Sequence, residues 1–240
     1  MSDTAYLALL LDAPMQSWGF SSRFQRRTTE LHPTKSGVIG LLCAAMGLAK
    51  GSTEELAMLP ELAKLKMTSI AIPRDGHGAS SPPPVLRLED FHTVLDTRRA
   101  SGAMNKDAVI SRRQYLLDAR FGVILEGPRS VLERARDALQ DPVWGVWLGR
   151  KSCIPAEPVF VELSESQDAA WKAVLRACKL SEETLMETFT NVTEVADFAK
   201  GTDSIGDQPV SFGDGASSGP DKRKFAVRRI KVTRPVQSKI

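Results

Sequence analysis

The sequence predicts an α+β fold in which strands and helices alternate, with a projecting hairpin and a smaller C-terminal region. Three observations predict this class. Short apolar runs of strand length alternate with segments of helical periodicity in the first two thirds of the 240-residue chain. A long polar and basic stretch interrupts this alternation after Pro84, and the charge pattern changes after residue 160. With 42% hydrophobic residues, the chain can bury a substantial core.

Local signals place the elements that precede the polar stretch. Apolar residues recur at helical spacing up to Lys50, and Gly51 is expected to end that helix. Ser52 and Glu55 form a capping box that begins a second helix. In chain order we expect a strand at 6–11, a helix at 36–50, a helix from 52 to about 66, a strand at 67–73 and a turn or linker at 75–84.

After the linker come residues 85–88 and a polar, basic stretch, followed by two strand-like runs at 112–117 and 121–125. Ser130 and Glu133 form a second capping box, and Pro142 stops the helix that it begins. The resulting β-α-β-β-α-β order fits a ferredoxin-like or RRM-like sheet with two helices on one face. Because many unrelated functions use this topology, the fold does not identify the function.

The charge distribution indicates two parts of the chain. Residues 1–160 form the expected RRM-like domain, with a thumb insertion at about 85–115, and residues 161–240 form an acidic segment followed by a basic C-terminal strand region. Within that region, 162–203 holds nine acids against four bases, whereas the segment from Lys222 to the end holds eight bases and no acid. This asymmetry, rather than the net charge of +3, indicates a surface that faces a polyanion. We expect the basic segment to neutralise phosphates without reading bases.

Composition disfavours several protein classes. No run of about 18 apolar residues is present and the apolar stretch 6–11 is too short for a signal-peptide core, so we expect a cytoplasmic protein that does not contact a membrane. Cys43, Cys153 and Cys178 have neither disulfide-framework nor zinc-site spacing. The three histidines are not at metal-ligand spacing, and no Walker or dinucleotide motif occurs. We predict no metal and no cofactor.

One arrangement keeps an enzyme open as an alternative. A metal-independent ribonuclease needs a base, an acid and phosphate stabilisation, which His92 with Tyr115 or a lysine can supply. The other interpretation of His92 is a hydrogen-bonded strand histidine or an RNA contact. Because the catalytic inventory is sparse, we prefer the second interpretation and predict that the chain is not an enzyme.

The turn after the first strand carries residues suited to binding RNA. Gln16 and Ser17 can hydrogen-bond phosphates or base edges, and Trp18 can stack on a base. A buried loop anchor uses the same apolar face of Trp18, so this alternative stays open. Arg26 and Arg27 follow and add positive charge near the turn.

Two further stretches are basic. The centre of the polar segment 90–115 is too small and polar to build a core, so we expect a projecting β-ribbon with basic sides; a surface loop is the alternative. Its cations are Arg98, Arg99, Lys106, Arg112 and Arg113. In the segment 144–153, two glycines allow close backbone approach to a phosphate, and Arg150 and Lys151 add charge.

The order of five motifs resembles the CasD family of type I-E CRISPR systems. They are Ala13-Pro14-Met15-Gln16-Ser17-Trp18-Gly19, Pro33-Thr34-Lys35-Ser36-Gly37, Asp90-Phe91-His92-Thr93-Val94, Arg113-Gln114-Tyr115-Leu116-Leu117-Asp118-Ala119 and Leu148-Gly149-Arg150-Lys151-Ser152-Cys153. The resemblance spans about residues 5–160. A weaker match follows at 207–210 and 222–229, while 162–203 matches only as a variable region.

The resemblance implies a non-catalytic subunit of a type I CRISPR Cascade surveillance complex, which acts in antiviral defence and caps the 5′ handle of the crRNA. It also implies contacts with the backbone subunit and the large PAM-reading subunit, and only indirect engagement of target DNA. The expected RNA contacts are Gln16, Ser17, Trp18, Arg26, Arg27, Lys35, His92, Arg98, Arg99, Lys106, Arg112, Arg113, Tyr115, Arg150 and Lys151.

Two other functions stay open at this point. A type I-C branch of the family processes precursor RNA with Tyr, Lys and His, but this chain lacks a Lys-His dipeptide in the comparable region. A generic RRM-like regulator would carry aromatic residues on its central strands, whereas the expected first strand offers only Tyr6 and the strand at Phe121 has no RNP1-like pattern. We therefore do not expect the sheet to be the RNA platform.

Overall fold

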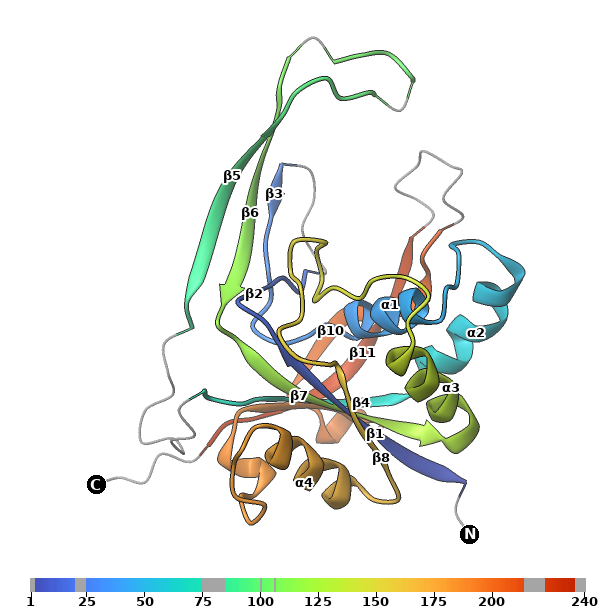
Figure 1. The fold of residues 1–240 in the computed structure, drawn as a ribbon, viewed down its shortest axis with the longest axis vertical. Helices are drawn as coiled ribbons and strands as arrows, with labels where there is room; N and C mark the ends of the chain where they lie inside the picture. Colours follow the sequence, from blue (N-terminus) through green and yellow to red (C-terminus); the bar gives the residue numbers. More distant parts are fainter. Residues whose placement is uncertain are drawn as a thin grey trace.

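The computed structural model describes residues 3–19, 25–74, 85–99, 101–105, 107–213 and 223–235 (Figure 1). Its strands are β1 (Thr4–Asp12), β2 (Met15–Gln16), β3 (Arg26–Arg27), β4 (Lys66–Ala71), β5 (Arg87–Val94), β6 (Val109–Leu117), β7 (Arg120–Pro128), β8 (Phe160–Ser164), β9 (Asn191–Glu194), β10 (Asp203–Ser211) and β11 (Lys224–Thr233). Its α-helices are α1 (Lys35–Ala45), α2 (Thr53–Lys64), α3 (Arg129–Gln140) and α4 (Gln167–Ala177), and two 3-10 turns are Met186–Thr188 and Phe198–Lys200.

The central sheet confirms the predicted ferredoxin-like fold. Four of its strands lie in the order β8-β1-β7-β4, and each neighbouring pair is antiparallel. This order is produced by two interleaved β-α-β units, in which β1 connects through α1 and α2 to β4, and β7 connects through α3 to β8. The β5–β6 ribbon is inserted between the two units, where the sequence predicted a projecting thumb.

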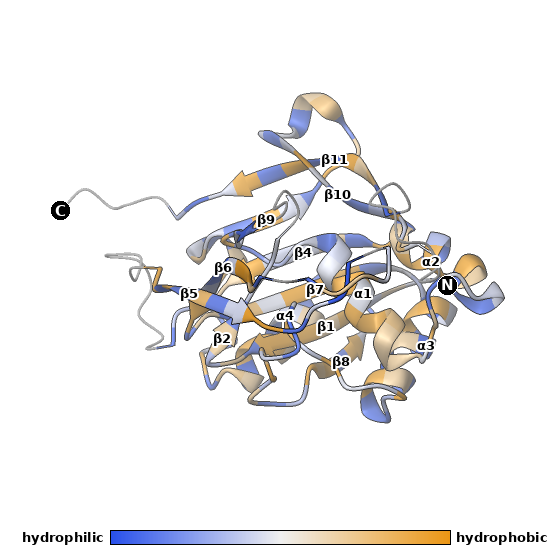
Figure 2. Cartoon of the chain, turned by 90° about the horizontal axis from the view of Figure 1, so that it is seen from above, coloured by the Kyte–Doolittle hydropathy of each residue, from blue (hydrophilic) through white to orange (hydrophobic). Residues whose placement is uncertain are grey.

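Helices cover both faces of the central strands. Along β1, Leu7, Leu9 and Leu11 pack in the core formed with α1, α2 and α3, whereas Ala8 and Leu10 pack in a second core formed with α4. The hydrophobic colours of Figure 2 accordingly dominate β1 and β7, while β11 alternates. Both faces of the central strands are therefore occupied by the chain's own helices.

The C-terminal region extends the same sheet. The seven-stranded sheet continues beyond β4 through β9, β11 and β10. The expected boundary between 1–160 and 161–240 falls at the start of β8, which pairs with β1. The acidic segment contributes α4 and β9, and the basic segment forms β11, so in this structure the two parts share one sheet.

The projecting ribbon lies close to the expected insertion at 85–115, but its strand β6 is longer than the strand-like run predicted at 112–117. β5 and β6 pair antiparallel from Arg87 opposite Leu116 to Val94 opposite Val109. An isolated bridge between Arg98 and Met104 continues the ribbon toward its tip (Figure 1). Polar residues interrupt both strands, at Glu89 and Asp90 in β5 and at Ser111 to Gln114 in β6, which obscured the strand ends in the sequence. The predicted linker at 75–84 lies outside the described residues.

Two predicted helix boundaries are wrong. The first helix ends at Ala45 rather than near Lys50, because Gly47 adopts φ +69° and a Cβ there would lie 2.7 Å from Val143 Cγ1. The capping box predicted at Ser130 does not form, because α3 begins at Arg129 directly after β7 and has no side-chain cap. The capping box of α2 is confirmed, since Ser52 Oγ accepts from Glu55 N at 3.1 Å.

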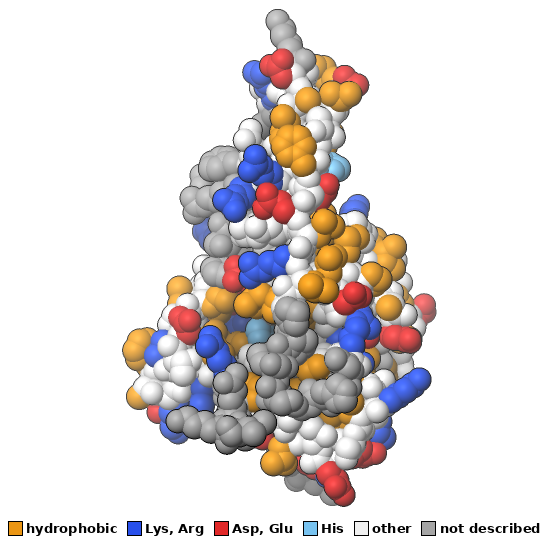
Figure 3. All heavy atoms as spheres, turned by 90° about the vertical axis from the view of Figure 1, so that its left-hand side faces the viewer, with side chains coloured by type: hydrophobic (Ala, Val, Ile, Leu, Met, Phe, Trp, Pro, Cys, Tyr) orange, Lys and Arg blue, Asp and Glu red, His pale blue; other side chains and the backbone are white. Residues whose placement is uncertain are grey.

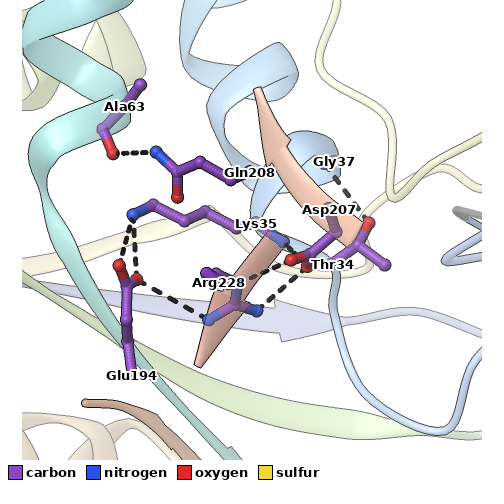
Figure 4. A network of polar contacts seen from close by, with 8 residues as sticks. All are labelled: Thr34, Lys35, Gly37, Ala63, Glu194, Asp207, Gln208 and Arg228. Atoms are coloured by element: carbon purple, nitrogen blue, oxygen red, sulfur yellow. Dashed lines mark hydrogen bonds and ion pairs between the residues drawn. The ribbon is translucent and has the colours of Figure 1, made fainter. Parts of the chain in front are cut away.

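A buried polar network joins the start of α1 to the C-terminal strands (Figure 4). The Asp207 carboxylate accepts from the Lys35 backbone N–H at 2.7 Å and from Arg228 Nε at 2.6 Å and Nη2 at 2.9 Å. Glu194 Oε2 lies 2.8 Å from Lys35 Nζ and 3.6 Å from Arg228 Nη1. Lys35 and Asp207 are completely buried, so their polar groups are satisfied by one another, Arg228 and Glu194 in place of water, while Arg228 Nη1 makes no hydrogen bond in the described structure.

The network also neutralises the N-terminal end of α1. Lys35 is the first residue of the helix, so its N–H has no partner within the helix. Asp207 binds that N–H and adds a negative charge where the helix dipole is positive. Burial lowers the pKa of Lys35, and the Glu194 carboxylate opposes that change. The helix is thereby fixed against β10 and β11.

We predict that Asp207→Ala lowers the free energy of unfolding by about 3–5 kcal/mol, because it leaves the buried Arg228 guanidinium without its main partner. Urea denaturation of the full chain measures the change. The matched control is Glu182→Ala, which removes an exposed partner of Arg176 and should cost less than about 1 kcal/mol. Equal losses for the two variants would contradict the assigned role of the network.

Candidate nucleic-acid interface

An open groove of about 760 Å³ lies where α1, the loop after α3 and the ends of β10 and β11 meet. Its lining includes parts of three of the five motifs recognised in the sequence. These are Ser17 to Gly19, then Thr34, Ser36 and Gly37, and finally Gly149 to Lys151. The folded chain thus brings together segments that lie more than 100 residues apart, since Ser17 N donates to Leu148 O at 3.1 Å. The groove is the candidate interface.

Cationic and aromatic side chains line this groove. The cations are Arg27, Lys50, Arg150, Lys151 and Arg223, and one carboxylate, that of Glu55, is present among the lining residues. The aromatic rings are Trp144, Trp147, Phe212 and Phe225 together with the deeper Trp18. Trp144 and Phe225 are 44% and 41% exposed, so their rings are open to a ligand. This combination suits a single nucleic-acid strand, because cations hold phosphates and rings stack on bases.

The turn residues predicted to contact RNA form a buried anchor instead. Gln16 Nε2 donates to Leu11 O at 3.0 Å and to Ala119 O at 2.7 Å, and its Oε1 accepts from Trp18 Nε1 at 3.0 Å. Gln16 and Trp18 are 0% and 1% exposed. Ser17 is also buried, and its Oγ donates to Gln114 O at 3.2 Å. These polar groups already have partners, so the alternative of a buried loop anchor describes this turn.

The glycine predicted to approach a phosphate approaches the backbone of that anchor. Gly149 adopts φ +99°, and a Cβ there would lie 1.7 Å from Ser17 O. The loop can therefore pack on the turn only with glycine at this position. Lys35, another expected RNA contact, is fully buried in the network with Glu194 and Asp207. Gly149 and Lys35 therefore support the walls of the groove, and we do not expect them to contact its ligand.

Arg150 connects the loop to the ribbon. Its guanidinium lies 4.6 Å from the centroid of the Tyr115 ring and donates to Gln114 O at 2.9 Å and Arg27 O at 3.0 Å. Tyr115 is only 5% exposed, so it supports Arg150 from below. Lys151 is exposed, and its Nζ lies 5.6 Å from the centroid of the Trp147 ring. The loop thus presents two cations on aromatic supports.

Four arginines lie side by side where β3 pairs with β6. The register places Arg26 opposite Arg112 and Arg27 opposite Arg113, and Arg113 Nε donates to Ser111 Oγ at 3.1 Å. Arg27 lines the groove and also a second hollow of about 430 Å³ between β3 and the ribbon. The cationic surface therefore continues from the groove to the base of the thumb.

The remaining predicted contacts lie on the ribbon. Arg98 and Arg99 are exposed near its tip, where Arg99 Nε donates to Asn105 Oδ1 at 2.7 Å. Lys106 lies outside the described residues. His92 is half-buried opposite Ser111, with Nδ1 3.8 Å from Asp90 Oδ2. Tyr115 is four residues farther along β6, or roughly 13 Å, so the structure does not bring the candidate base and acid together.

Part of the basic C-terminal segment has a structural role. Arg228 is buried beside Asp207, and the Arg229 guanidinium covers the Phe198 ring at 4.1 Å while donating to Phe198 O and Gly201 O. Arg223 faces the groove, and Lys224, Lys231 and Arg234 are exposed. Two cations of the segment, Arg228 and Arg229, are already engaged within the chain. The expectation that the segment neutralises phosphates therefore applies only to its other cations.

Sequence reasoning missed several residues of the groove. Lys50, Phe212 and Phe225 line it without having been selected, and Trp144 and Trp147 were given no role within the selected segment 144–153. Arg223 was expected only to neutralise phosphates as part of the basic C-terminal segment. Burial, followed by repulsion from Arg223, lowers the pKa of Lys50, so these two cations lie near each other. The spacing of Trp144 and Trp147 beside a glycine was the one available signal; the Lys50–Arg223 pairing depends on tertiary structure alone.

The described residues contain no group of three or more His, Cys, Asp or Glu side chains placed to hold a metal ion. Burial, and then the Glu55 carboxylate, raises the pKa of the Cys43 thiol at the groove to about 12, so this thiol stays protonated. None of the helices in the described part of the chain combines the length and apolar composition that crossing a bilayer requires.

Comparisons with known proteins agree with this arrangement. The family model for CRISPR-associated protein (Cas_Cas5) matches residues 6–231. The CRISPR system Cascade subunit CasD of Escherichia coli (strain K12) is 32% identical over 168 residues, which cover 68% of this chain and 73% of that protein. A chain of a solved CRISPR RNA-guided surveillance complex is 26% identical with a TM-score of 0.69, covering 95% of this chain and 88% of that one. A crystal structure of a Cas protein is 28% identical with a TM-score of 0.55, covering 96% and 95%.

Proposed function

This chain belongs to the Cas5 family of CRISPR-associated proteins, and we propose that it is the Cascade subunit that binds and caps the 5′ handle of the crRNA. The observation that carries the proposal is the groove, in which five cations surround exposed aromatic rings. A single RNA strand has both features that this surface binds, a charged backbone and unstacked bases. The surveillance-complex chain that this protein resembles over 95% of its length supports the same assignment.

The ribbon supplies the proposed contact with the neighbouring backbone subunit. Phe91, Leu95 and Met104 are 60%, 68% and 48% exposed on this ribbon. Figure 3 shows hydrophobic side chains alternating with charged ones along the projecting part of the molecule. Exposed apolar groups on an element that contributes little to the core indicate a protein interface. We assign the body to contacts with the large PAM-reading subunit, so that target DNA is engaged only indirectly.

The subunit is proposed to act without catalysis. Precursor RNA cleavage would need a base and an acid on the same scissile phosphate. His92 and Tyr115 are well separated on the ribbon, and Tyr115 is buried beneath Arg150. The groove presents cations and rings but no histidine among its lining residues. This geometry favours binding over cleavage.

We predict that the full chain leaves labelled repeat RNA intact, both in EDTA and with magnesium, because no base and acid pair faces one phosphate. Denaturing gels resolve any product. Site-specific cleavage that disappears in His92→Ala or Tyr115→Phe would contradict the non-catalytic function and establish the ribonuclease alternative. The Tyr115 variant keeps the aromatic support of Arg150, so its result reports on the hydroxyl alone.

We predict that Arg27→Ala combined with Lys151→Ala weakens RNA binding and reduces the slope of log affinity against log salt by about 1.4. Each exposed cation that neutralises a phosphate of single-stranded RNA contributes about 0.7 to that slope. Fluorescence anisotropy across a salt series with single-stranded RNA measures it. The matched control is Lys172→Ala on α4, outside the groove, which should leave the slope unchanged. An unchanged slope in the double variant would remove this end of the groove from the interface.

We predict that Phe91→Ala combined with Arg98→Ala leaves the free energy of unfolding within about 0.5 kcal/mol, because both side chains are exposed. The same variant should lose the backbone subunit and crRNA when the complex is co-purified. Leu185→Ala combined with Lys172→Ala, an equally exposed pair away from the ribbon, is the control and should assemble normally. Normal assembly of the ribbon variant would show that the ribbon is not the thumb.

A further inference from the structure

One buried carboxylate oxygen at the groove has no partner. Glu55 is only 2% exposed, and it is the single acidic residue among the described groove-lining residues. Its Oε2 accepts from Gly51 N at 3.0 Å. Its Oε1 is buried and makes no hydrogen bond within the described structure. A buried acceptor without a donor costs free energy comparable to a lost hydrogen bond, so the unused oxygen calls for a ligand.

The capping box accounts for only one of the two carboxylate oxygens of Glu55. In the capping box, Ser52 Oγ accepts from Glu55 N, and the carboxylate returns to the backbone N–H of Gly51. That task uses one carboxylate oxygen, and glutamine performs it equally well. Glu55 itself lines the groove, where α2 meets the end of α1, and its second oxygen is buried there without a hydrogen bond in the described residues. The helix cap therefore gives no role to this second oxygen.

The surroundings of Glu55 define a subsite. Lys50 and Arg223 line the same groove and lie close enough for Arg223 to lower the pKa of Lys50, after the larger effect of burial. Glu55 influences Lys50 electrostatically, yet neither cation forms an ion pair with a carboxylate among the described residues. Two adjacent cations can hold a phosphate, whereas the carboxylate repels one. The two cations therefore favour the phosphate of a nucleotide, whereas the carboxylate favours a hydrogen-bond donor on the sugar or the base.

We propose that Glu55, Lys50 and Arg223 form a nucleotide subsite in which Glu55 Oε1 accepts a hydrogen bond from the RNA while the two cations hold the adjacent phosphate. This inference rests on the proposed RNA-binding function. The donor is either a base amino or imino group or a ribose 2′-hydroxyl, because these are the donors that single-stranded RNA offers. A carboxylate oxygen cannot form a hydrogen bond with a group that lacks a donor proton. The subsite therefore selects a hydrogen-bond donor on the RNA and does not respond to charge alone.

The test uses Glu55→Gln in the full chain. Glutamine keeps an oxygen for the Gly51 N–H but presents an amide NH₂ in place of the free acceptor, so a recognised donor meets another donor. The matched control is Glu54→Gln, which makes the same change at the adjacent exposed position. The probes are labelled homopolymers of each base, as RNA and as DNA, and anisotropy reports their affinities. Thermal denaturation shows whether either variant alters stability.

The expected result is a loss of about tenfold in affinity for the probe that the unaltered chain prefers, with little change for the others and none in Glu54→Gln. Loss of the preference for RNA over DNA identifies the ribose hydroxyl as the donor, and loss of the preference among bases identifies a base edge. Lys50→Ala and Arg223→Ala should weaken all probes alike.

Three outcomes overturn the inference. If Glu55→Gln binds every probe as the unaltered chain does, Glu55 is only a helix cap, and the proposed RNA-binding function stands. If the variant loses stability and weakens all probes equally, its role is structural. If the unaltered chain binds no probe, the proposed RNA-binding function fails together with this inference.

Discussion

The groove depends on the buried contact of Asp207 with the first N–H of α1 and with Arg228. This contact joins residues that are 172 positions apart in the chain and fixes the helix against the C-terminal hairpin. One wall of the groove comes from α1, and the opposite wall carries Phe212, Arg223 and Phe225 from the ends of β10 and β11. A shift between α1 and this hairpin would change the shape of the groove. The buried charges of Asp207 and Arg228 thus determine how the exposed cations of the groove are arranged.

A second junction holds the remaining side of the groove. The turn at Gln16 to Trp18 is saturated with internal hydrogen bonds, and the loop at Gly149 packs directly on it. Arg150 then extends from this loop to the carbonyls of Gln114 and Arg27. The cationic surface is consequently built on rigid backbone contacts. Such preorganisation lowers the entropy lost when a flexible RNA strand binds.

Local patterns predicted the fold well, because they report interactions between near neighbours. The order of strands and helices, the capping box at Ser52 and the projecting ribbon all follow from periodicity, spacing and polarity within short windows. The end of α1 was missed because Val143, almost a hundred residues later, leaves no room for a Cβ at Gly47. The capping box expected at Ser130 did not form because β7 runs directly into α3. Nonlocal packing overrode a valid local signal in both cases.

The candidate site was predictable only in part, for the same reason. Trp18 and Trp144 lie near glycines in similar sequence contexts, yet one is 1% exposed and the other 44%. Lys35 and Lys151 both belong to recognised motifs, but only the former finds Glu194 across the sheet and becomes buried. Residue type indicates which chemistry a position can perform, whereas exposure and partners depend on segments distant in the sequence.

The exposed ribbon connects the structure of this chain to its proposed assembly with other subunits. A two-stranded ribbon is marginal by itself. Two short strands add to it, since β2 pairs with β6 at the base of the ribbon and β3 pairs with the middle of β6, at Arg112 and Arg113. Phe91, which lies opposite Arg112, and Leu95, which directly follows β5, are exposed on this ribbon. Their burial against a neighbouring subunit would stabilise the outer ribbon and, through Arg27 and Arg150, the groove at its base. In the proposed complex, protein assembly and RNA binding therefore reinforce each other, because the same strands contribute to both surfaces.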